Sequence, residues 1–105
     1  MLDARLDSAG AVLVRGLPLR TPADFSELFL GLGLESVRYH GYTTRREVAP
    51  GVFTANLRDP GKAIDLHNDM GQDPVMPEHL FLFCVEPPPA GAGGETSIAR
   101  SADWR

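Results

Sequence analysis

The apolar positions of this chain cluster in short runs, and the first run predicts a strand. Residues 9–19, AGAVLVRGLPL, are rich in β-branched and apolar side chains. Gly16 and Pro18 close the run. A short apolar run bounded by such residues is typical of a buried β-strand.

A helix is predicted directly after this strand. Thr21 suits the N-cap, Pro22 suits the first turn, and Asp24 stands three residues after the cap. Gly31 and Gly33 are expected to end the helix. The apolar positions recur at helical spacing: Phe25, Leu28, Phe29 and Leu32. This stripe indicates a face packed in the core, not a cofactor-binding motif.

The rest of the chain favours strands separated by loops. Residues 36–63 read mostly as loop, with a short strand at GVFTANL, residues 51–57. HLFLFCVE, residues 79–86, is apolar on both faces, as in a strand inside a sandwich or barrel. PPPAGAGG, residues 87–94, then turns the chain into a further strand at ETSIA, residues 95–99. The predicted class is mainly β with one or two helices (α+β).

The composition limits which partners and which cellular location are expected for the protein. The 105 residues suit a single domain, and 14 acidic against 10 basic side chains give no reason to expect nucleic acid as a partner. No window is apolar enough to span a membrane, and MLDARLDSAG lacks the basic-then-apolar order of a secretory signal. We therefore expect a cytoplasmic protein with no membrane partner.

Two further residues bear on the interior and on the extent of the domain. Cys84 is the only cysteine and, within FLFCVE, is expected to be a small buried hydrophobe. Ser101 looks like an N-cap whose helix is cut off four residues later, at Arg105. We expect residues 1–105 to be a single, truncated N-terminal part of a larger domain.

The candidate chemistry lies in DLHNDM, residues 65–70. On an extended segment His67 and Asp69 would share one face and could hold one metal ion, while Asn68 would point away. The same spacing also occurs in loops where the aspartate caps a turn and the histidine is merely exposed. From these residues alone both interpretations stay open.

The order of these motifs resembles a known enzyme family. The His-x-Asp of residues 67–69, the aromatic strand, the proline cluster and Gly-Gly-Glu-Thr at 93–96 follow one another as in the N-terminal half of TauD/TfdA-like, clavaminate-synthase-like dioxygenases. The resemblance implies a partial double-stranded β-helix (jelly roll) with a helix packed outside it. It also implies an iron(II)- and 2-oxoglutarate-dependent oxygenase of the hydroxylase or desaturase type, incomplete in this chain. The alternative is a catalytically inactive β-rich fragment that acts as a binding or oligomerisation module.

The resemblance also assigns roles to single residues. His67 and Asp69 match two members of the family's iron-binding triad, and Thr96 matches the threonine that contacts 2-oxoglutarate. The family's second histidine and its cosubstrate-binding arginine lie downstream of GGET, and no residue here matches either. His79 is the only local substitute for the histidine, and it stands where the chain enters the core.

The substrate and partners are less well defined by the sequence. A small-molecule substrate is expected, and Tyr42, Arg45 and Arg46 are candidates to bind its carboxylate or phosphate. Solvated surface arginines are the alternative interpretation. Strands without neighbours leave free backbone groups and apolar faces, so we expect a homo-oligomer or poor solubility. A complementing chain is the alternative partner.

Overall fold

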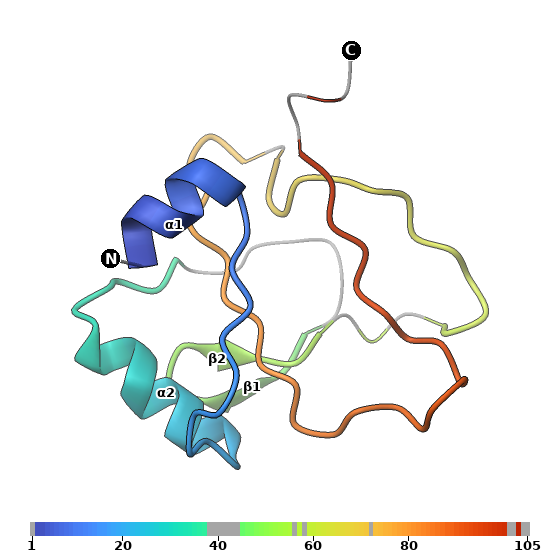
Figure 1. Ribbon diagram of the computed structural model, residues 1–105, viewed down its shortest axis with the longest axis horizontal. Coiled ribbons are helices and arrows are strands. Elements are labelled where there is room, and N and C mark those ends of the chain that lie inside the picture. The colour runs from blue at the N-terminus through green and yellow to red at the C-terminus, as the bar shows by residue number, and fades with distance from the viewer. Residues whose placement is uncertain are drawn as a thin grey trace.

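The described residues of the chain form two helices and one small antiparallel sheet (Figure 1). The computed structural model describes residues 2–37, 45–55, 57, 59–71, 73–100 and 103. The elements are α1 (Leu2–Ala9), α2 (Pro22–Gly31), β1 (Glu47–Ala49) and β2 (Val52–Phe53). The other described residues run in turns and irregular segments. The α+β class is therefore confirmed in its coarse form. The described residues are not mainly β, however, because both helices are longer than either strand.

Helix α2 begins where its capping signals predict. The Thr21 hydroxyl accepts the Asp24 backbone N–H at 3.1 Å. The Asp24 carboxylate in turn accepts the backbone N–H groups of Arg20 and Thr21, both at 2.9 Å. These bonds, foremost the one from Arg20, lower the pKa of Asp24 because they favour its charged form. The predicted capping box is confirmed.

Helix α1 was not predicted, and it overlaps the start of the strand expected at residues 9–19. The helix has no buried residue and ends at Ala9. Gly10 follows with φ +80°, and its N–H donates to the Leu6 carbonyl at 2.7 Å. The predicted strand is wrong for the described chain, because residues 11–20 pair with no other segment in it. Apolar composition alone does not make a strand without a hydrogen-bonding neighbour.

Strands β1 and β2 form a hairpin that packs on α2. The pair is antiparallel, and a bond from the Thr54 N–H to the Arg46 carbonyl at 2.9 Å extends it. The turn passes through Gly51, which has φ +71°. Ser26 of α2 is 2% exposed, and its hydroxyl donates to the Pro50 carbonyl at 2.6 Å. The strand predicted at 51–57 is confirmed only at Val52–Phe53, and β1 was missed.

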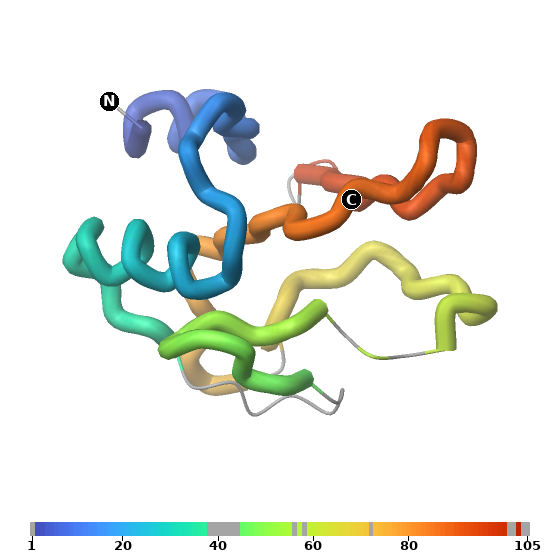
Figure 2. Tube along the Cα trace, turned by 90° about the horizontal axis from the view of Figure 1, so that it is seen from below, coloured from blue at the N-terminus to red at the C-terminus, as the bar shows by residue number. Residues whose placement is uncertain are grey.

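Residues 79–86 cover α2 with one of their two faces. The Phe83 ring stacks on Phe25 with centroids 5.2 Å apart, and the Phe81 ring meets Phe29 edge-on at 5.7 Å. Phe25 and Phe29 of the predicted helix stripe therefore pack against this run. The prediction of a core position is wrong for Leu28 and Leu32, which are 37% and 50% exposed. In Figure 2, α2 lies between α1 and the hairpin in height.

The other face of the same run is open to solvent. Leu80 and Leu82 are 57% and 65% exposed. Cys84 is exposed as well, so the prediction of a buried cysteine is wrong. The strands predicted at 79–86 and 95–99 are also wrong for the described chain, in which only β1 and β2 pair. Without paired strands on either side, alternate residues have no second layer to pack against.

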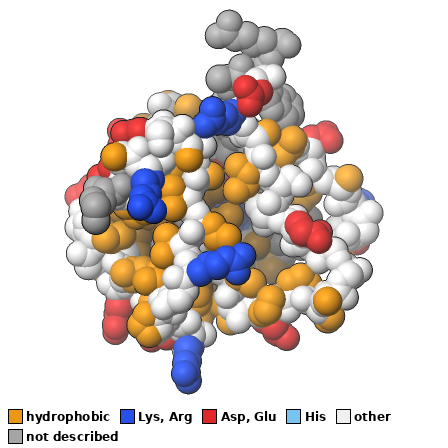
Figure 3. Space-filling model, viewed as in Figure 1, with side chains coloured by type: hydrophobic (Ala, Val, Ile, Leu, Met, Phe, Trp, Pro, Cys, Tyr) orange, Lys and Arg blue, Asp and Glu red, His pale blue; other side chains and the backbone are white. Residues whose placement is uncertain are grey.

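The described residues leave much apolar surface uncovered. None of their hydrophobic side chains is fully buried, and apolar groups are spread over the face seen in Figure 3. The accessible surface is 9321 Å², against about 5800 Å² for a compact monomer of this mass. The radius of gyration is 14.7 Å, against about 13 Å for a compact domain of this length. The expected jelly roll is not confirmed, since the described chain contains a two-stranded sheet.

Within the described ranges, no helix combines the length and the apolar character needed to cross a bilayer.

Candidate metal centre

The orientation of His67 is set by its own backbone. Its Nδ1 lies 2.7 Å from the Asp65 carbonyl oxygen. A carbonyl can only accept, so Nδ1 carries the hydrogen and donates it. In a neutral imidazole this leaves the Nε2 lone pair available to a metal. A carbonyl or carboxylate on the second ring nitrogen is the usual arrangement around metal-binding histidines.

Asp69 sits in a tight turn, not on the extended segment that the sequence predicted. The Gly71 N–H donates to the Asn68 carbonyl at 3.1 Å and closes the turn. Met70 has φ +55°, a conformation that non-glycine residues seldom adopt. A side chain at Gly71 would be crowded, because an added Cβ would lie 3.2 Å from the Asn68 carbonyl oxygen. Asp69 is the second residue of this turn, and Met70, which has the positive φ, follows it in the chain.

The two predicted ligands, His67 and Asp69, lie close together although the backbone at Asp69 is a turn and not the predicted extended segment. His67 Nε2 lies 3.6 Å from Asp69 Oδ1, with the side chains 58% and 27% exposed. Two ligands of one first-row ion, each about 2.1 Å from it at right angles, are about 3 Å apart. The pair therefore needs to close by only a fraction of an ångström. A neutral imidazole nitrogen and a carboxylate oxygen also suit iron(II), so the donor set fits the metal that the sequence implied.

A shallow cavity adjoins the pair. Its volume is about 370 Å³. It is lined by His67, Asn68, Asp69, Met76, Pro77, Glu78 and Leu80. The residues thus place the polar pair beside the apolar side chains of Met76 and Leu80. Asn68 borders the cavity along with both predicted ligands.

A third protein ligand is not assembled in the described part of the chain. There, no three His, Cys, Asp or Glu side chains gather closely enough to hold a metal ion. His79 instead faces an aromatic neighbour, with its ring centroid 6.3 Å from that of Phe81. The local triad of His67, Asp69 and His79 is therefore not formed.

Arg45 makes a contact with Asp69 that the sequence did not predict. Its terminal guanidinium nitrogen lies 3.6 Å from Asp69 Oδ1, and the Arg45 side chain is 22% exposed. The sequence suggested a substrate-binding role for Arg45 but gave no signal that it would meet Asp69. The contact depends on tertiary structure, because the hairpin and the turn are far apart in the sequence.

The remaining predicted site residues are not brought to this pair. Thr96 is exposed, and it lines neither the cavity beside His67 nor a second cavity beside Arg100. Its role toward 2-oxoglutarate stays a prediction. Tyr42 lies outside the described residues. Arg46 is exposed and takes part in the hairpin through its backbone.

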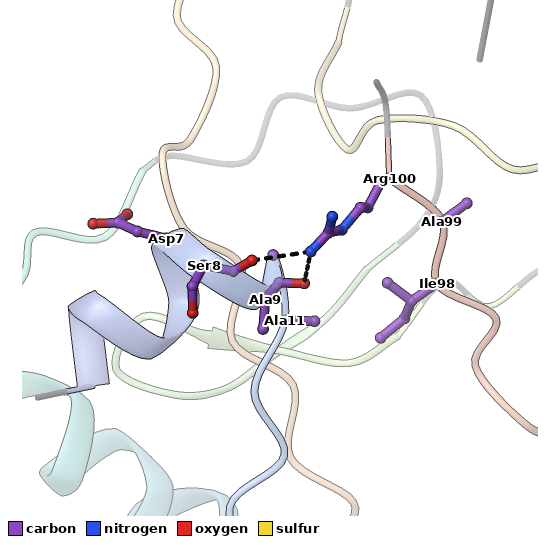
Figure 4. Close-up of a pocket in the computed structure, with 8 residues that line it drawn as sticks. Asp7, Ser8, Ala9, Ala11, Ile98, Ala99 and Arg100 are labelled. Carbon is purple, nitrogen blue, oxygen red and sulfur yellow. Dashed lines mark hydrogen bonds between the residues drawn. The ribbon is translucent and has the colours of Figure 1, made fainter. Parts of the chain in front are cut away.

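The segment that carries Thr96 is tied to the N-terminal helix by Arg100. The Arg100 guanidinium donates to the carbonyl oxygens of Ser8 and Ala9 at 3.0 and 3.1 Å (Figure 4). These carbonyls belong to the last turn of α1, where a cation also opposes the negative end of the helix dipole. The cavity of about 530 Å³ at this contact is lined by both segments. Arg100 thus fixes residues 98–100 against α1.

Comparison with known proteins decides the family. Residues 1–102 match the profile described as "Taurine catabolism dioxygenase TauD, TfdA family". The chain belongs to this family. Among curated TauD/TfdA relatives, it is 38% identical over 102 residues to a clavaminate synthase-like protein of Arabidopsis thaliana, covering 95% of this chain. It is 31% identical over 99 residues to the dapdiamide synthesis protein DdaC of Enterobacter agglomerans, covering 93% of this chain.

The match covers a limited part of those TauD/TfdA relatives. The chain spans 30% of the length of each. No solved structure matches the sequence. The family resemblance inferred from the order of the motifs is confirmed.

Proposed function

We propose that this chain provides part of the active site of an iron(II)- and 2-oxoglutarate-dependent oxygenase. One observation carries the proposal: His67 Nε2 and Asp69 Oδ1 converge to 3.6 Å in a chain that belongs to a dioxygenase family. Asp69 is a carboxylate, whereas the related halogenases that resemble this motif have a small residue instead. The proposal is therefore a hydroxylase or desaturase.

Each residue has a separate task in this proposal. His67 offers the Nε2 lone pair, held in place by the Asp65 carbonyl, and Asp69 offers a negative oxygen. The Thr96 hydroxyl would contact a carboxylate group of 2-oxoglutarate, as the family motif implies. Iron(II), when bound together with 2-oxoglutarate and oxygen, supplies the oxidation of an unactivated carbon. The protein contributes ligation, orientation and exclusion of water.

The proposed site needs more than these residues. A facial triad has three protein ligands, and the described residues bring together two. We propose that a different polypeptide region or a complementing chain supplies the third ligand and the arginine that binds 2-oxoglutarate. Two ligands confer little chelate advantage, so the 105-residue chain should bind iron(II) weakly and form no succinate from 2-oxoglutarate.

Anaerobic iron(II) titration tests this proposal. We expect weak binding by the unmodified chain, loss of binding in His67→Ala and in Asp69→Ala, and little change in His79→Ala, which is the matched histidine control. With 2-oxoglutarate present, a visible charge-transfer band should appear only after a complementing polypeptide is added. Binding that survives both His67→Ala and Asp69→Ala would show that the pair is not the metal site.

The exposed surface favours a second candidate function. The chain exposes 9321 Å², about 3500 Å² more than a compact monomer of its mass, and a standard protein interface buries about 1600 Å². An inactive module that binds or oligomerises through this surface is the alternative. Light scattering at high protein concentration distinguishes the states, because a monodisperse monomer would contradict an oligomerisation module.

A further inference from the structure

We propose that the Arg45 guanidinium holds Asp69 in the metal-free protein and exchanges with the metal ion when it binds. This inference rests on the proposed function, since it assumes that His67 and Asp69 are iron ligands. It assigns Arg45 a role in metal binding in place of the substrate contact that the sequence suggested.

The contact geometry makes Arg45 and a metal ion competitors. Asp69 Oδ1 lies 3.6 Å from the Arg45 guanidinium and 3.6 Å from His67 Nε2. The oxygen that would bind an ion shared with His67 is therefore the same oxygen that faces the arginine. A divalent cation bound there would also lie close to a permanent positive charge, which opposes its binding.

The backbone next to Arg45 is anchored. The Arg46 N–H donates to the Thr54 hydroxyl at 3.1 Å, and the Thr54 N–H returns a bond to the Arg46 carbonyl at 2.9 Å. The hairpin that begins there is joined to α2 by the hydrogen bond from Ser26 to Pro50. Arg45 therefore reaches Asp69 from a fixed position.

The ion pair between Arg45 and Asp69 is strengthened by its partial burial. The side chains of Arg45 and Asp69 are 22% and 27% exposed, so salt screens them less than a fully solvated pair. In the metal-free protein, Asp69 Oδ1 faces both the Arg45 guanidinium and His67 Nε2. When metal binds, this pair must break, and the apparent metal affinity falls accordingly.

A cobalt(II) titration of the 105-residue chain tests the exchange. The paramagnetic shift of the His67 ring protons reports binding at this site even when affinity is low. Arg45→Gln removes the competing charge, and we expect the Kd for cobalt to fall about two- to fivefold, as for loss of a partly exposed ion pair. Arg45→Lys keeps the positive charge, so its Kd for cobalt should remain close to that of the unmodified chain.

Arg46→Gln is the matched control, because it removes the same charge from the neighbouring residue. Its Kd should stay unchanged. An equal gain of affinity in Arg46→Gln would show a general effect of net charge and would overturn the inference. Unchanged or weaker cobalt binding in Arg45→Gln would also overturn the inference. It would not contradict the proposal that His67 and Asp69 bind the metal.

A second measurement needs no substitution. In the unmodified chain, the Arg45 Nε–H resonance should shift at the same zinc(II) concentrations as the His67 ring, because the guanidinium leaves Asp69. An Arg45 signal that stays constant while His67 titrates would refute the exchange. If His67 responds to neither metal in any variant, the proposed metal site itself fails, and the inference fails with it.

Discussion

Replacing Ser26 with alanine tests the contact that joins α2 to the hairpin. Ser26 is 2% exposed, and its hydroxyl donates to the Pro50 carbonyl at 2.6 Å. Loss of a hydrogen bond of this kind costs about 0.5–1.5 kcal/mol, and a buried acceptor left without a partner costs about 1–3 kcal/mol. Alanine also raises helix propensity by about 0.5 kcal/mol, which offsets part of this loss.

Ser8→Ala provides the matched control for that offset. Ser8 also lies in a helix, but its hydroxyl donates to the exposed Arg5 carbonyl at 3.1 Å, where water can replace it. We expect the free energy of unfolding of Ser26→Ala to be about 1–2 kcal/mol lower than that of Ser8→Ala. Urea denaturation followed by far-ultraviolet circular dichroism measures the difference.

Hydrogen exchange adds a local measurement. The Thr54 amide, which bonds to the Arg46 carbonyl, should exchange faster in Ser26→Ala because the hairpin is no longer held on α2. Equal unfolding free energies for Ser26→Ala and Ser8→Ala, with unchanged exchange at Thr54, would refute this account of how the hairpin is positioned.

Two further predictions concern the capping box and the hairpin turn. Asp24 has a pKa below its ordinary value, so its stabilisation of α2 is present above about pH 4 and is lost as pH falls through the lowered pKa. Far-ultraviolet circular dichroism should show this acid loss of helix in the unmodified chain and a smaller one in Asp24→Asn. Gly51→Ala should destabilise by about 1–2 kcal/mol, because φ is +71° and the new Cβ would lie 3.3 Å from Ser36. Gly31→Ala, with nothing within 4 Å of its added Cβ and no positive φ, should not destabilise, and equal losses in the two variants would contradict the turn argument.

The elements that the sequence predicted well are those whose determinants are local. The cap of α2 is contained within Thr21, Pro22 and Asp24, and the structure forms it as expected. The strand predictions at 9–19 and 79–86 relied on composition, whereas a strand also requires a partner that may lie anywhere in the chain. Those two segments have apolar side chains but no paired neighbour among the described residues.

The candidate site shows the same division between local and distant determinants. The proximity of His67 and Asp69 was predictable from their spacing, although Asp69 lies in a turn and not on an extended strand. The contact between Arg45 and Asp69 was not predictable, because it joins two residues that are far apart in the sequence and belong to different segments. The proposed role of Thr96 comes from the family motif and has no counterpart in the contacts of the described residues.

The Arg100 contact has a consequence for the order of folding. It joins positions 92 and 91 residues apart, whereas the hydrogen bond from Ser26 to Pro50 spans 24. Because the entropy cost of closing a loop grows with its length, contacts between distant positions form late. We expect α2 and the hairpin to fold first and α1 to join residues 98–100 afterwards. Thr96, on the same segment as Arg100, would therefore be among the last residues to reach its place and among the first to leave it when the chain opens locally.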